Sequence, residues 1–67
     1  MADRQVVRVV ARDGTVRWLG PETPFGNREL VDREQADVMD PSTAGQAEWR
    51  FRRGHAWRGY DISTEDA

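Results

Sequence analysis

The sequence predicts an α+β domain in which two β-hairpins flank one short helix, in the order ββαββ. Two observations favour it: a valine-rich segment that leads into an Asp-Gly turn, and an aromatic segment interrupted by Arg-Arg-Gly. A chain of 67 residues has room for one small domain, taken to be residues 1–67. The strands can pair as an antiparallel sheet with the helix across one face, or close into a small curled barrel.

Residues 5–19 have the pattern of the first hairpin. The segment QVVRVVA is rich in β-branched residues, which favour strands, and Asp13-Gly14 favours a two-residue type I′ turn before TVRWL. The predicted core face of this hairpin consists of Val7, Val9, Ala11, Val16 and Trp18. The opposite face mixes arginines with three apolar residues: Val6, Val10 and Leu19. We expect a partner to cover this half-apolar face, because contiguous apolar patches rarely stay exposed.

The middle of the chain is predicted to hold a loop and then the helix. Residues 20–28 contain two prolines and two glycines, which leaves little room for a regular element. A helix of about 33–39 is expected next, because Asp32 can cap its N-terminus with Gln35 in the capping-box position. The Asp-Pro pair at 40–41 is expected to end it, since the residue before a proline avoids the helical conformation. So short a helix must dock on the sheet to be stable.

Residues 47–62 are predicted to form the second hairpin. The sequence RRG at 52–54 suits a three-residue loop whose glycine takes the left-handed conformation. The resulting register places the aromatic side chains and the histidine on one face: Trp49, Phe51, His55 and Trp57. The acidic tail, residues 63–67, is expected to fray at the end of the domain.

The composition bounds the classes of function. The chain has 12 acidic and 10 basic residues, all of the latter arginine, and a formal net charge of -2. This slightly acidic balance argues against a dedicated DNA-binding domain, which usually has a basic excess. Arginine without lysine is consistent with codon bias in a GC-rich genome and also with selection for planar, bidentate donors. The sequence has no apolar stretch of signal-peptide or membrane-spanning type, so we expect a cytoplasmic protein with no membrane contact.

No pattern of catalytic or ligand-binding residues stands out. The chain has no cysteine, so it offers neither a disulfide nor a thiolate for zinc or for nucleophilic attack. His55 is the single histidine and has no serine or cysteine nearby in a triad-like setting. The glycines are isolated rather than grouped in a phosphate-binding loop. The sequence therefore predicts a protein that is not an enzyme and that uses no cofactor and no metal.

The arginine-rich and aromatic segment at 48–60 is the strongest local signal for a partner. Arginine and tryptophan are common at the energetic centres of protein interfaces, and a polarised surface can steer an acidic partner. The leading hypothesis is a protein–protein interaction module, for example a phage or mobile-element accessory protein that binds a host or virion protein. Its candidate contact residues are Arg50, Arg52, Arg53, Arg58, Val10, Leu19 and Arg17.

Two other functions are consistent with the sequence. In a nucleic-acid-binding protein, phosphates would contact the arginines of the second hairpin and bases would stack on aromatic rings. The candidate residues for that role are Arg50, Arg52, Arg53, Arg58, Trp57 and Tyr60. In a small self-assembling structural component, exposed strand edges and the half-apolar face of the first hairpin would join copies of the chain.

Overall fold

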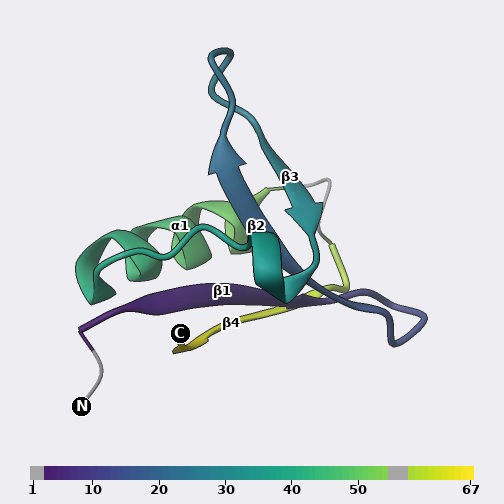
Figure 1. Ribbon diagram of the computed structural model, residues 1–67. Helices are drawn as coiled ribbons and strands as arrows, with labels where there is room; N and C mark the ends of the chain where they lie inside the picture. Colours follow the sequence, from purple (N-terminus) through teal and green to yellow (C-terminus); the bar gives the residue numbers. More distant parts are fainter. Residues whose placement is uncertain (1–2, 55–57) are drawn as a thin grey trace.

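The computed structural model describes residues 3–54 and 58–67. Its elements follow in the order β1 (Gln5–Val10), β2 (Val16–Glu22), β3 (Arg28–Val31), a 3-10 turn η1 (Arg33–Gln35), α1 (Pro41–Arg53) and β4 (Asp61–Asp66). The strands form one antiparallel sheet in the order β3-β2-β1-β4, with α1 against it (Figure 1). The predicted α+β class with an antiparallel sheet and one helix is confirmed, and the sheet is open rather than a curled barrel.

The β1–β2 hairpin lies where it was predicted, but its loop is one residue longer. The Gly14 N–H donates to the Ala11 carbonyl at 3.0 Å, and the Ala11 N–H donates to the Thr15 carbonyl at 2.8 Å. The loop therefore has three residues and ends in Gly14, whose φ of 91° is left-handed. This is the alternative hairpin geometry that an Asp-Gly sequence also allows.

The longer loop changes which side chains share a face. Arg8 pairs with Trp18 and Val9 with Arg17, one residue away from the predicted register. A shift of one residue exchanges the two faces of a strand, so the predicted faces are wrong for β2. Leu19 joins the core, whereas Trp18 lies on the opposite face of the sheet.

The predicted loop at 20–28 is largely a second hairpin. β2 continues to Glu22, and β3 begins at Arg28. A left-handed glycine again closes the turn: the Gly26 N–H donates to the Thr23 carbonyl at 2.9 Å, with a φ of 81°. The strand tolerates Pro21 because the pairing with β3 is irregular between Leu19 and Glu22, and prolines occur in strands at such irregularities.

The helix lies later in the chain than predicted. Only the short turn η1 occupies the predicted 33–39 helix, and α1 covers much of the segment predicted as the hairpin 47–62. The Asp-Pro pair at 40–41 starts a helix instead of ending one. The Asp40 carboxylate accepts hydrogen bonds from the Thr43 N–H at 3.3 Å and the Thr43 hydroxyl at 2.5 Å, and Pro41 occupies the first turn. Proline is favoured there because its missing N–H would have no partner within the helix.

The side chains of α1 favour a helix over a strand pair. Ala44, Ala47 and Phe51 recur at helical spacing and form the stripe that faces the sheet. Glu48 and Arg52, four residues apart, form an ion pair at 2.8 Å. Alanine, glutamine, glutamate and arginine are also among the better helix formers. Together these outweigh the strand preference of the aromatic residues.

The C-terminal segment forms the strand β4 rather than a frayed tail. It pairs with β1 along its whole length, from Gln5 with Asp66 to Val10 with Asp61. Ile62, which is buried, anchors it in the core. The predicted fraying of residues 63–66 is therefore wrong, because β1 offers them a free edge to pair with.

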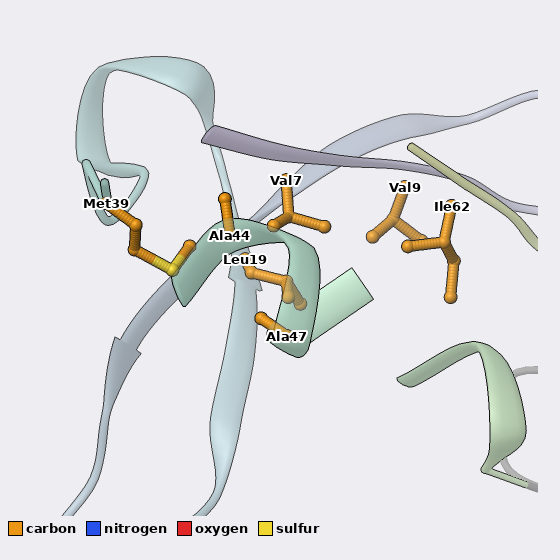
Figure 2. Packing of buried hydrophobic residues seen from close by; sticks show 7 residues of the cluster. All are labelled: Val7, Val9, Leu19, Met39, Ala44, Ala47 and Ile62. Atoms are coloured by element: carbon orange, nitrogen blue, oxygen red, sulfur yellow. The ribbon is translucent and has the colours of Figure 1, made fainter. Parts of the chain in front are cut away.

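The core lies between the sheet and α1, which packs over β1 and β4. Its buried members are Val7, Val9, Leu19, Met39, Ala44, Ala47 and Ile62 (Figure 2). The opposite face of the sheet, here called the back face, buries Val6 to 2% exposure. On that face the Trp18 Nε1–H donates to Glu65 Oε1 at 2.5 Å, and the Arg33 Nε–H donates to the same oxygen at 3.3 Å.

Removal of the Asp40 cap is expected to destabilise the protein in a pH-dependent way. The Thr43 hydroxyl, and then its backbone N–H, hold the pKa of Asp40 below the usual 3.8. The ionised cap therefore stabilises the fold at neutral pH, and this contribution is lost as the pH falls through the lowered pKa. We expect Asp40→Ala to lower the Tm at neutral pH. The difference in Tm between the variant and the wild type should disappear in acid.

Two variants control this measurement. Asp40→Asn keeps a good capping residue without the charge, so it should keep most of the Tm and lose the pH dependence. Asp3→Ala removes the same charge at an exposed position and should leave the Tm almost unchanged. If the Tm difference between Asp40→Ala and the wild type stayed constant from neutral pH to acid, the proposed role of the ionised cap would be contradicted.

Candidate functional site

The structure separates the predicted contact residues of the first hairpin. Leu19 has no exposed surface, so its assignment as a contact residue is wrong; the longer loop turned it into the core. Val10 lies half-buried on the back face of the sheet. Arg17 is exposed, and its Nη1 contacts Asp32 Oδ1 at 2.5 Å. These three residues do not form one surface.

The predicted arginines of the second hairpin also separate. Arg52 turns back to the fold, where it contacts Glu48 Oε1 at 2.8 Å and donates to the Ile62 carbonyl at 2.5 Å. Arg50 and Arg53 stay exposed on α1. Arg58 lies in the turn before β4, and its carbonyl accepts hydrogen bonds from the Arg12 guanidinium.

The aromatic candidates for base stacking lie in different settings. Tyr60 is half-buried against the core, so it is not an open stacking platform. Trp57 and His55 lie outside the described residues. Trp49, which the predicted hairpin placed on one face with Phe51, is 61% exposed.

The exposed side of α1 brings together the residues that remain. We define the outer surface of α1 as Ser42, Gln46, Trp49, Arg50 and Arg53, all of which are exposed. The Arg53 guanidinium lies over the Trp49 ring, 4.5 Å from its centre. This contact is a cation–π interaction, and it holds both side chains together at the surface. Helical spacing explains the surface, because Trp49 falls opposite the buried stripe of Ala44 and Ala47.

A cleft of about 180 Å³ borders this surface. It lies between α1 and the β2–β3 hairpin, whose outer half rises away from the layer of β1, β4 and α1 (Figure 1). The residues that give it polar and aromatic walls are Glu22, Arg28, Thr43, Gln46, Arg50 and Phe51. The cleft is smaller than the roughly 300–1,000 Å³ of typical small-molecule sites, so it suits one side chain or a small ion.

Arg28, which lines the cleft, is held in place by two hydrogen bonds. Its Nη1 donates to the Gly20 carbonyl at 2.9 Å and to Asp37 Oδ2 at 2.8 Å. The Asp37 N–H in turn donates to the Leu19 carbonyl at 3.0 Å, which ties the chain after η1 to β2. The Arg28 side chain is only 13% exposed, so this ion pair is largely shielded from solvent. Sequence reasoning missed Arg28 because its role depends on three separate segments.

Three further properties of the described part of the chain bear on its function. Within residues 3–54 and 58–67, no three His, Asp or Glu side chains are grouped so that they could hold a metal ion. None of the described helices has the length and apolar character needed to span a membrane. The tip of the β2–β3 hairpin carries Phe25, which is 89% exposed.

Comparisons with known proteins add no relative. No family model, no curated protein and no solved structure matches the chain. The functional assignment therefore depends on the geometry of the outer surface of α1 and of the cleft beside it.

Proposed function

We propose that this chain is a non-enzymatic protein–protein interaction module that binds its partner through the outer surface of α1. The observation that carries the proposal is the exposure of Trp49, at 61%, with Arg53 stacked on its ring. The chain has only three tryptophans and two phenylalanines with which to build a core. An indole left outside such a core is available for burial against a partner, and tryptophan and arginine are frequent interface hot spots.

A nucleic-acid partner is a weaker explanation of the same surface. Non-specific binding to nucleic acid requires several cations placed along a phosphate backbone. Of the four predicted phosphate contacts, Arg52 is bound to Glu48 and the Ile62 carbonyl, and Arg58 lies apart in the turn before β4. Only Arg50 and Arg53 lie together, exposed on α1. The net charge of -2 also opposes a polyanion at long range.

Self-assembly is disfavoured by charge at two of the surfaces that could mediate it. Two copies joined through the outer surface of α1 would bring Arg50 and Arg53 of each close to those of the other. Two copies joined edge to edge through β4 would set the acidic strand DISTED against itself. Like charges opposite one another destabilise strand pairing. Arg52 also occupies the Ile62 carbonyl beside that edge. A different protein is therefore the better partner.

Affinity capture from a lysate of the organism that encodes the chain tests this proposal. The baits are the wild type, Trp49→Ala and a control, Val38→Ala, which shortens another exposed apolar side chain away from α1. Each capture is run with and without nuclease and read by mass spectrometry. We expect a stoichiometric protein that survives nuclease, binds the wild type and Val38→Ala, and is lost with Trp49→Ala.

The other outcomes contradict the proposal in different ways. Recovery that disappears with nuclease would indicate nucleic-acid binding. A protein that binds all three baits equally would place the interface away from Trp49. An empty capture, together with a concentration-dependent increase in mass by light scattering, would indicate self-assembly.

A further inference from the structure

We infer that the partner presents an acidic segment, whose carboxylates bind Arg50 and Arg53 beside Trp49, with one carboxylate entering the cleft beside Arg50. The inference rests on the proposed function, because it names the chemistry of the partner at the same surface. It is carried by three observations: unpaired cations, an absence of acids on that surface, and a cleft with free donors.

The two arginines of the surface have no acidic partner within the described residues. Four ion pairs are formed there, and none of them includes Arg50 or Arg53. Glu48, the only acid of α1, is already bound to Arg52 and lies on a flank of the helix. The outer surface of α1 therefore carries two positive charges and no negative one, although the whole chain is acidic.

These charges also have a structural effect, which does not account for the whole arrangement. Arginines in the last turn of a helix interact favourably with the negative end of its dipole. That effect would be obtained with any side chain at position 49. It leaves unexplained why a large apolar ring lies exposed next to the two cations, with Arg53 stacked on it. A partner that buries the ring and neutralises both arginines accounts for all three side chains.

The cleft supplies donors for a carboxylate. Arg50 and Gln46 line it from α1, and Arg28 lines it from β3. Asp37 balances the charge of Arg28 but engages only its Nη1. Among the described residues no buried side-chain nitrogen lacks a hydrogen-bond partner, so the other nitrogens of Arg28 are not left buried and unsatisfied. A guanidinium group binds a carboxylate through two parallel hydrogen bonds, and Arg50 can bind an entering carboxylate in this way.

The position of Glu22 limits where the acidic group can lie. Glu22 belongs to the hairpin wall of the cleft, whereas Arg50 belongs to the helix wall. Repulsion from Glu22 directs an entering carboxylate to the α1 side. The cleft volume of about 180 Å³ leaves room for a side chain but not for a folded element. The bound segment is therefore expected to run along α1 in an extended form and to insert a single side chain.

The test titrates the isotope-labelled full chain with acetylated hexaglutamate amide at low salt, followed by NMR. We expect the amide signals of α1 to shift more than those of β4. Arg50→Ala should weaken binding about tenfold, the effect of losing one hydrogen bond to a charged group. The matched control is Arg4→Ala, which removes the same charge from an exposed residue outside the ion pairs and should bind nearly as the wild type does. Arg50→Lys keeps the charge but loses the paired donors of the guanidinium, so its affinity should lie between those of Arg50→Ala and Arg4→Ala.

Three results would overturn the inference: equal loss of affinity in Arg50→Ala and Arg4→Ala, the absence of shifts in α1, or tighter binding of oligothymidylate than of hexaglutamate. The capture experiment separates this inference from the proposed function. A nuclease-resistant partner that needs Trp49 but binds Arg50→Ala as well as the wild type would leave the interaction module in place and refute the acidic segment. If the wild type itself captured no nuclease-resistant partner, the interaction module would be refuted.

Discussion

The substitution Leu19→Ala is expected to lower the free energy of unfolding by about 3 kcal/mol, as is usual for a leucine truncated in a packed core. Leu19 has no exposed surface and lies among Val7 and Ala47 beneath α1. Small domains are stable by only about 5–15 kcal/mol, and a chain this short belongs at the lower end. The variant should therefore be partly unfolded at moderate temperature, which urea titration monitored by circular dichroism would measure.

Val10→Ala is the matched control for this prediction. Val10 lies in the adjacent strand but on the back face, where it is only half-buried, so we expect a loss of about 1 kcal/mol. The comparison also tests the hairpin register. A two-residue loop would place Leu19 on the face of Val10 and make the two losses similar. Similar losses would therefore show that the three-residue loop is wrong.

The first hairpin illustrates what local sequence can predict. Asp13-Gly14 located the turn correctly, because few other sequences favour a chain reversal as strongly. It could not distinguish a two-residue loop from a three-residue loop ending in Gly14, since both suit the same pair. That choice is made by distant residues: Ala44 and Ala47 bring α1 close to the sheet, and Leu19 fills the space beneath it.

The helix shows a second limit of prediction from the sequence. An aspartate before a proline can either end one helix or begin the next, because Asp40 itself is extended in both cases. The spacing of Ala44, Ala47 and Phe51 indicated the second choice. The aromatic alternation of Trp49 and Phe51 indicated a strand. Tertiary burial of the alanines decided between them.

The candidate site could not be predicted correctly while that choice was wrong. In a strand, residues 49 and 51 share a face, and both would enter the core. In a helix they lie well apart, so Phe51 packs inward while Trp49 faces solvent. The sequence offered Arg50, Arg52 and Arg53 alike as candidate contact residues, and the structure leaves Arg50 and Arg53 exposed. It gave no means of excluding Arg52, whose carbonyl partner on Ile62 is brought near only by β4.

The second large effect is expected for Trp18→Ala, which should lower the free energy of unfolding by about 2 kcal/mol. This is below the usual value for a fully buried tryptophan because the ring is only partly buried. Trp18 lies on the back face, where Val6 is buried to 2% exposure without contact with the main core. Removal of the indole uncovers that face. It also removes the donor to Glu65, which links β2 to β4 across β1.

Comparison with Trp49→Ala makes the prediction specific to position. Trp49 lies on a helix surface, so its replacement should change stability by less than about 0.5 kcal/mol while it abolishes partner binding. Trp18→Phe keeps most of the ring and loses only the hydrogen bond, so it should fall between the two in stability. Equal losses for Trp18→Ala and Trp49→Ala would contradict the separation of roles. The expected pattern assigns one tryptophan to the fold and the other to the partner, although the sequence offers both as large apolar residues beside arginines.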